Sequence, residues 1–250
     1  MDDLELAFRT SDLAARRALE YFAAGVSVST KADGSPVTEA DRGVEQLLRE
    51  TLSAARVGDA FLGEEFGESG ESERVWILDP IDGTSSFTRG EPNWRVQLAL
   101  QVNGRTELAV VTSPALGLCW WATRGGGAFE SAWPRSEARR LEVSTTATVA
   151  DAVLDAVGND PRLPTARPPA SPLPLIELVR GEIDGFLVER YSTWDHTPWI
   201  LLVEEAGGRF TNPLGTNAGD QNGGVYSNAN LHPELLAMLN YPSVRRRSGW

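Results

Sequence analysis

The chain has 250 residues, 41% hydrophobic and 23% charged, which is enough to bury one large core or two closely joined ones. Its 23 Lys and Arg against 35 Asp and Glu leave a formal net charge of −12, which argues against a nucleic-acid-binding surface and fits either solubility or carboxylates gathered around metal. No stretch approaches the roughly 20 apolar residues of a membrane span, and the acidic N-terminus lacks the basic region of a signal peptide, so a cytoplasmic location is expected.

Two helices are expected at the start of the chain. Apolar residues recur at helical spacing over residues 4–22, which predicts a long helix that ends at Gly25. Thr38 and Asp41 resemble a capping box at the start of a second helix. Its apolar face is formed by Val44, Leu47, Leu48 and Leu52. Capping by itself is a sufficient explanation of Asp41.

Two adjacent acids, Glu64 and Glu65, then lie between an apolar pair and Gly67. Adjacent carboxylates repel each other unless a cation or solvent separates them. Solvated loop acids are the favoured interpretation, and it changes only if another acidic motif lies nearby.

Such a motif follows in the stretch around which the chain is organised. Residues 75–78 are short, apolar and β-rich, which predicts a buried strand, and Asp79-Pro80 is expected to end it because proline has no amide to donate. Asp79 and Asp82 flank the carbonyl of Ile81. Three oxygen donors within four residues suit a hard divalent cation such as Mg²⁺.

Gly83 and Thr84 come next and can expose amides at the start of a helix, where a phosphate is stabilised by unpaired N–H groups and the helix dipole. Asp, Pro and Gly are also ordinary turn residues. A strand, an Asp-Pro turn and an N-capped helix therefore explain this local sequence about as well as a metal and phosphate site does.

Strands dominate the rest of the first half, residues 1–150. Residues 94–102 alternate apolar and polar side chains, as a half-buried strand does, and Asn103-Gly104 predicts a hairpin to a strand over 107–112. Further strands are expected over residues 118–123 and 139–144, with a turn at 124–127 between them. The single cysteine, Cys119, lies in an apolar run, which favours a buried, inert thiol and excludes an internal disulfide. Helices on a mostly antiparallel sheet are the expected result.

The second half, residues 151–250, begins with a proline-rich connection over 158–174 that is expected to be exposed and extended. A helix over 175–180 and a buried strand over 183–189 should follow. Residues 194–203 then predict a helix, capped by Asp195 or Thr197, with Pro198 in its first turn. The remaining elements are strands over 209–211 and 224–227 and a helix over 233–239.

Taken together, these motifs carry a recognisable pattern. The chain resembles the inositol monophosphatase family of Mg²⁺-dependent phosphomonoesterases, and within it the histidinol-phosphate phosphatase branch. The motifs that carry the resemblance are Pro36-Val37-Thr38-Glu39-Ala40-Asp41-Arg42, Gly63-Glu64-Glu65-Phe66-Gly67, Asp79-Pro80-Ile81-Asp82-Gly83-Thr84 with Phe87, Arg139-Arg140-Leu141-Glu142-Val143-Ser144, and Trp194-Asp195 with Gly207-Gly208.

The resemblance implies an α+β fold, a layered α-β-α-β-α sandwich, and a homodimer. It implies two or three Mg²⁺ ions, and their ligands would be Glu64, Asp79, the Ile81 carbonyl, Asp82 and Asp195. Asp41 paired with Thr84 would orient the attacking water, Glu64 would assist in catalysis, and the Gly83 and Thr84 amides would hold phosphate. Metal-assisted hydrolysis needs no covalent nucleophile. Accordingly, His196 is expected at the start of a helix and His232 in a surface cap.

Several positions depart from the family pattern, and they concern the substrate. Ser85 and Ser86 replace polar residues common in relatives, Trp199 follows the last aspartate where small residues are usual, and the proline-rich connection replaces a strand that contacts substrate. Ser85, Glu189 and Asp195 are the candidate substrate contacts, although the spacing of Glu189 is one residue short.

Three functions follow from these observations. The first is hydrolysis of a small alcohol phosphate, with histidinol phosphate leading and inositol phosphate next. The second is a specialised phosphatase for a nucleotide or sugar phosphate, which Trp199 and the altered substrate region favour. The third is a non-catalytic relative that binds a phosphorylated ligand or another subunit.

Overall fold

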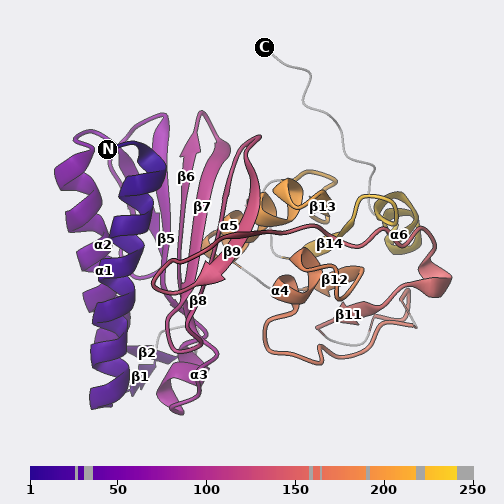
Figure 1. The fold of residues 1–250 in the computed structure, drawn as a ribbon, viewed down its shortest axis with the longest axis horizontal. Helices are drawn as coiled ribbons and strands as arrows, with labels where there is room; N and C mark the ends of the chain where they lie inside the picture. The colour runs from indigo at the N-terminus through magenta and orange to yellow at the C-terminus, as the bar shows by residue number, and fades with distance from the viewer. Residues whose placement is uncertain are drawn as a thin grey trace. The chain divides into compact units, whose positions relative to one another are not determined.

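The computed structural model describes residues 1–25, 28–30, 36–157, 160–163, 165–189, 192–217 and 223–240. The chain forms two compact units, Met1–Arg140 and Leu141–Trp250 (Figure 1). Each unit combines helices with a β-sheet, which confirms the expected layered α+β fold. In the described part of the chain, every helix is too short or too polar to cross a bilayer.

The first unit is built on an eight-stranded sheet in the order β10-β9-β8-β7-β6-β5-β3-β4. All neighbouring strands are antiparallel except β3 and β5, so the expected mostly antiparallel sheet is confirmed. Its strands are β3 (Ala60–Gly63), β4 (Gly67–Ser69), β5 (Arg74–Asp82), β6 (Arg95–Val102), β7 (Arg105–Ser113), β8 (Leu118–Thr123), β9 (Gly127–Ala132) and β10 (Arg139–Arg140). A separate antiparallel pair consists of β1 (Val28–Thr30) and β2 (Pro36–Thr38).

Two long helices, α1 (Asp3–Ala24) and α2 (Glu39–Ala55), lie side by side against one face of this sheet (Figure 1). Their small and branched apolar residues pack on the sheet residues that point the same way. The core contains Leu6, Ala14, Val44 and Leu48 from the helices and Trp76, Leu78, Trp94, Val96 and Leu98 from the sheet. A short helix, α3 (Thr84–Thr88), follows β5. The opposite face of the sheet carries the side chains that alternate with these apolar residues.

The expectation that Asp79-Pro80 ends the central strand is wrong, because β5 continues to Asp82. Asp79 pairs with Gln97 and Asp82 pairs with Arg95, so β5 has one more residue than β6 over this stretch. Such an extra residue is a β-bulge, and a proline is tolerated at a bulge because its missing N–H breaks no ladder bond there.

The β6–β7 hairpin forms at Asn103-Gly104 as expected, with both residues at positive φ, 52° and 71°. The prediction of a half-buried β6 is wrong, because Gln97 and Ala99 on its second face are also fully buried. The turn at 124–127 is confirmed, but it leads to β9, which the sequence analysis missed. As a result, the strand expected over 139–144 is reduced to the two residues of β10.

The second unit contains a four-stranded sheet in the order β11-β12-β14-β13, in which only β11 and β12 are parallel. The strands are β11 (Leu154–Ala156), β12 (Gly185–Val188), β13 (Gly208–Thr211) and β14 (Gly224–Asn228). Helix α6 (His232–Leu239) packs on the face that presents Leu187 and Val225. Helix α5 (Thr193–Glu205) packs on the other face, where His196 contacts the rings of Phe210 and Tyr226. The helix α4 (Pro174–Val179) lies against α5.

The start of α5 differs from the expectation. Its N-cap is Ser192 rather than Asp195 or Thr197, and Asp195 is the third helical residue, whose Oδ2 accepts the Ser192 N–H at 2.7 Å. Pro198 accordingly lies inside the helix and not in its first turn. Ser192 and Asp195 together form a capping box, in which Asp195 is the N3 partner and not the N-cap.

The proline-rich connection contains no helix or named strand between residue 160 and Leu173 where it is described, as expected. Leu163 is nevertheless buried in the core beneath α6, and Arg167 forms an ion pair with the buried Asp155. His232, expected in a surface cap, is buried instead. Its ring accepts or donates hydrogen bonds of 2.7 Å to Thr211 and Ser227, because it begins α6 against β13 and β14.

Candidate active site

The bulge in β5 places two aspartates on the same face of the sheet. In a regular strand, residues three apart point to opposite faces. Gln97 and Arg95 are two apart on β6 and share a face, so their partners Asp79 and Asp82 share it too. This is the face opposite α1 and α2, since the alternate residues Leu78 and Leu98 are in the helix-covered core.

Side chains of β6 hold both aspartates. Gln97 Nε2 donates to Asp82 Oδ2 at 3.1 Å and approaches Asp79 Oδ2 at 3.4 Å. Arg95 forms an ion pair with Asp82 through two nitrogens, Nε and Nη2, that both contact Oδ2. Asp79 is 1% exposed and Gln97 is fully buried. The acidic pair is thus fixed by the neighbouring strand, with one guanidinium beside it.

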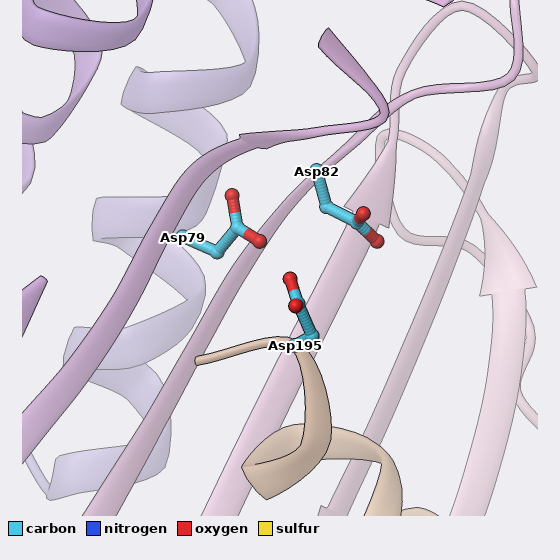
Figure 2. Close-up of side chains that lie close together, drawn as sticks. All are labelled: Asp79, Asp82 and Asp195. Atoms are coloured by element: carbon cyan, nitrogen blue, oxygen red, sulfur yellow. The ribbon is translucent and has the colours of Figure 1, made fainter. Parts of the chain in front are cut away.

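Asp195, from α5, is the third carboxylate that can share a cation with this pair. Figure 2 shows the side chains of Asp79, Asp82 and Asp195 close to one another, and one carboxylate oxygen from each lies within 4.8 Å of the others. Three carboxylates at this separation repel one another without a cation, and carboxylate oxygen is the ligand that hard divalent ions prefer. The cluster can therefore hold a metal ion.

Asp41 and Thr84 form a second group beside the end of β5. Asp41 Oδ2 accepts the N–H and the hydroxyl of Thr38, both at 2.7 Å, which confirms the capping box. The other oxygen, Oδ1, lies 3.2 Å from Thr84 Oγ1, which also lies 3.0 Å from the carbonyl of Ile81. A hydroxyl has one proton, so Thr84 can donate to only one of the two at a time. The family resemblance implied this Asp41–Thr84 pairing, although it did not indicate that Asp41 is buried.

Gly83 connects β5 to α3 in a conformation that suits glycine. Its φ is 87°, and a Cβ at this position would lie 2.7 Å from the carbonyl oxygen of Asn93. Any side chain here would push the backbone of the β5–α3 connection away from the strand that follows. Gly83 therefore fixes the path of the chain between Asp82 and Thr84.

Glu64 follows β3, which runs parallel to β5 with Gly63 opposite Leu78. Its N–H donates to the Leu78 carbonyl at 3.3 Å, so Glu64 leaves the sheet next to Asp79. Parallel strands bring their carboxyl ends to the same edge. The two acidic motifs are thus neighbours in the sheet, although the three-carboxylate cluster found among the described residues does not include Glu64.

The turn that carries Glu64 and Glu65 is supported by Glu45, which the sequence analysis missed. Glu45 is fully buried, and its carboxylate accepts the N–H groups of Glu65 at 2.7 Å and Phe66 at 3.3 Å. Arg49, one turn further along α2, donates to it at 2.8 Å. A Cβ on Gly63 would lie 2.0 Å from Glu45 Oε1, so a side chain at this position would displace the Glu45 carboxylate from the turn. The available signal was an acid next to Val44 on the apolar face of the helix.

The remaining candidates are not drawn into these groups. Ser85 is exposed on α3, and Glu189 is exposed at the end of β12. Trp199 lies on α5 and is 3% exposed. His196, in the first turns of α5, is also buried, and its Nδ1 lies 2.5 Å from the Tyr226 hydroxyl.

The buried Cys119 and His232 supply neither a thiolate nor a cation near pH 7. Burial raises the pKa of the Cys119 thiol to about 11, and the side chain lies in the core as expected. Burial lowers the pKa of His232 to about 4, so its imidazole is neutral near pH 7. A thiolate is the reactive form of cysteine, and Cys119 is therefore inert in the folded protein.

These observations define the class of protein. It has a layered α+β fold and a compact carboxylate cluster that can hold a metal ion. The chain belongs to the inositol monophosphatase family, whose model matches residues 3–241.

Proteins similar to this chain carry different names, and a solved structure shares its fold. A Streptomyces griseus protein named glucose-1-phosphate thymidylyltransferase is 38% identical over 95% of this chain and 96% of its own. The histidinol-phosphatase of Mycobacterium tuberculosis is 37% identical over 96% of this chain and 98% of its own. An inositol-1-monophosphatase of Mesorhizobium japonicum is 32% identical over 88% of this chain and 89% of its own. The crystal structure of the extragenic suppressor protein SuhB from Bartonella henselae matches with a TM-score of 0.80 at 28% identity. The match covers 94% of this chain and 97% of the SuhB chain.

Proposed function

We propose that this protein is a Mg²⁺-dependent phosphatase that hydrolyses a small phosphate monoester with an activated water. Histidinol phosphate is the first candidate substrate and inositol phosphate the second. The observation that carries the proposal is the convergence of Asp79, Asp82 and Asp195 within 4.8 Å. Membership of the inositol monophosphatase family and the histidinol-phosphatase relative support it.

The residues of the cluster fit a hydrated magnesium ion. The donors are hard carboxylate oxygens, which Mg²⁺ prefers, and Mg²⁺ usually keeps several waters. Gln97 Oε1 is buried and has no hydrogen-bond partner among the described residues, so an acceptor for a metal-bound water stands beside the two aspartates of β5. The Ile81 carbonyl and Glu64, which both belong to the ends of adjacent strands, are the further ligands that we propose.

When bound, Mg²⁺ supplies charge neutralisation for the phosphate, a more acidic water and stabilisation of the leaving oxygen. The chain's own part is to orient the reactants. With its proton donated to Asp41 Oδ1, the Thr84 hydroxyl presents its lone pairs to a water and aligns it. Because Thr38 occupies Asp41 Oδ2, the orientation of the carboxylate is fixed. Glu64 assists this step, and the Gly83 and Thr84 amides hold the phosphate.

Substrate recognition is assigned to Ser85, Glu189 and Asp195. Ser85 and Glu189 are exposed, and a hydroxyl and a carboxylate can each form a hydrogen bond with a hydroxyl or amine of the ester's alcohol. By family resemblance we also propose a homodimer, which sedimentation equilibrium tests directly.

The test is a phosphate-release assay on a panel of esters, with and without Mg²⁺. The panel contains histidinol phosphate, inositol 1-phosphate, glucose 1-phosphate, a nucleoside monophosphate and an aryl phosphate. Turnover should require Mg²⁺ and fall by roughly 10² or more in Asp79→Asn and Asp82→Asn, as for the loss of a transition-state charge partner. Undiminished turnover in either variant would exclude the mechanism.

The same panel decides between the substrate classes. A preference for glucose 1-phosphate or a nucleotide would favour a specialised sugar-phosphate or nucleotide phosphatase, for which the name of the Streptomyces griseus relative is the supporting observation. Adding a nucleoside triphosphate to glucose 1-phosphate tests nucleotidyl transfer itself. Metal binding without turnover of any ester would favour a non-catalytic ligand-binding relative.

A further inference from the structure

Arg95 lies beside the carboxylate cluster, and the proposed function gives it no role. It begins β6 directly opposite Asp82, and its Nε and Nη2 both contact Asp82 Oδ2. The Arg95 side chain is 13% exposed and that of Asp82 is 19% exposed. A pair this sheltered is screened by solvent far less than an exposed ion pair.

The contacts use one oxygen of Asp82 completely. Besides the two nitrogens of Arg95, Asp82 Oδ2 accepts Gln97 Nε2 at 3.1 Å. Three N–H donors leave no lone pair on that oxygen for a metal ion. A guanidinium also carries a permanent positive charge, because it does not lose its proton in proteins. A cation of the chain itself therefore already stands at a carboxylate that the proposed function assigns to Mg²⁺.

We propose that Arg95 is a resident counter-cation that competes with divalent metal for Asp82 and sets the metal affinity of the site. A metal ion that coordinates Asp82 must use Oδ1 alone or displace the guanidinium from Oδ2. Even without displacement, the guanidinium repels a divalent ion bound to the same carboxylate. The inference deepens the proposed function and rests on it, since it takes Asp82 to be a metal ligand.

The experiment measures Mg²⁺ binding by isothermal titration calorimetry, without substrate. Arg95→Ala should bind Mg²⁺ at least tenfold more tightly than the unaltered protein. Arg95→Gln should shift in the same direction by less, because a neutral amide can still donate to Asp82. The matched control is Arg105→Ala, which removes the same charge from an exposed pair with Glu107 and should leave the affinity within twofold.

A second readout guards against a folding effect. Without metal, Arg95→Ala should melt at a lower temperature, since Asp82 loses its partner, and added Mg²⁺ should raise its melting temperature more than that of the unaltered protein. Arg95→Gln carries the same test if Arg95→Ala fails to fold.

Each outcome separates the two proposals. Unchanged or weaker binding in both Arg95 variants, with binding by the unaltered protein, overturns the role of Arg95 and leaves the metal site intact. No binding by any variant overturns the metal site and the competition together. Binding that appears only once Arg95 is replaced supports the competition in its strongest form.

Discussion

Replacing the buried Glu45 with glutamine should destabilise the protein and loosen the turn that carries Glu64. The side chain keeps its size, so only its charge and one acceptor are lost. In the folded protein, Oε1 accepts Arg49 Nε at 2.8 Å and Phe66 N at 3.3 Å, and Oε2 accepts Glu65 N at 2.7 Å. The new NH₂ group must face one of these donors.

The magnitude follows from that geometry. Placing the NH₂ group at Oε2 leaves the Glu65 N–H without an acceptor, which costs about 1–3 kcal/mol for a buried group. The bond to Arg49 also changes from charge-assisted to neutral, and Arg49 keeps its contacts with Gly67 O and Ser69 Oγ. We therefore expect Glu45→Gln to lower the free energy of unfolding by about 2–4 kcal/mol.

Urea unfolding followed by circular dichroism measures this loss as a shift in midpoint. Glu50→Gln, an exposed position on the same helix, is the control and should stay within about 0.5 kcal/mol. If Glu45 positions Glu64 for metal, the Mg²⁺ concentration for half-maximal turnover should also rise in Glu45→Gln alone. A change below 0.5 kcal/mol refutes the hydrogen-bond argument, and a stability loss with unaltered Mg²⁺ dependence restricts Glu45 to a structural role.

Three further predictions concern single side chains. Thr84→Val should fold normally and lower kcat by roughly 10²-fold with little change in KM, because it removes a hydroxyl that orients water; unchanged steady-state kinetics would remove Thr84 from the mechanism. Burial and the nearby charge of Arg209 lower the pKa of His232 to about 4, so the unfolded chain takes up a proton below its ordinary pKa of 6.5 while the folded one does not. As the pH falls from 6.5 to 4, this residue should therefore lower the free energy of unfolding by up to about 3 kcal/mol. Urea titrations at each pH should show that His232→Gln lacks this part of the pH dependence. The same pH dependence in both proteins would contradict the prediction. Cys119 should not react with a thiol reagent at pH 8 until the protein is unfolded, and rapid labelling of the native protein would show that its burial is misjudged.

Much of this site could be predicted because its residues are local in sequence. The capping box of Asp41, the order of Asp79, Ile81 and Asp82, and the glycine that follows are all contained in short motifs. Hydrophobic periodicity also located α1 and α2, since both helices bury one regular stripe.

What could not be predicted depends on a partner strand or helix. The residues opposite Asp79 and Asp82 are set by the register of β6, so Arg95 and Gln97 looked like the polar positions of a half-exposed strand. Glu45 lies next to Val44 on the apolar face of α2, but nothing local shows that the turn at Glu65 would cover it. His232 was misjudged for the same reason, since the hydroxyls that receive it belong to two other strands.

The sequence Asp79-Pro80-Ile81-Asp82 explains why the site lies at an irregularity. With regular pairing, Asp82 would point into the core beneath α1 and α2, because shifting a strand by one residue reverses every side chain. One extra residue in β5 returns Asp82 to the face of Asp79 and brings Ile81 into the apolar core. Pro80 suits that extra position because the bulge needs no donor from it. The proline therefore does not end the strand, as its chemistry first suggests, but allows one strand to bury an apolar side chain between two carboxylates that face the same way.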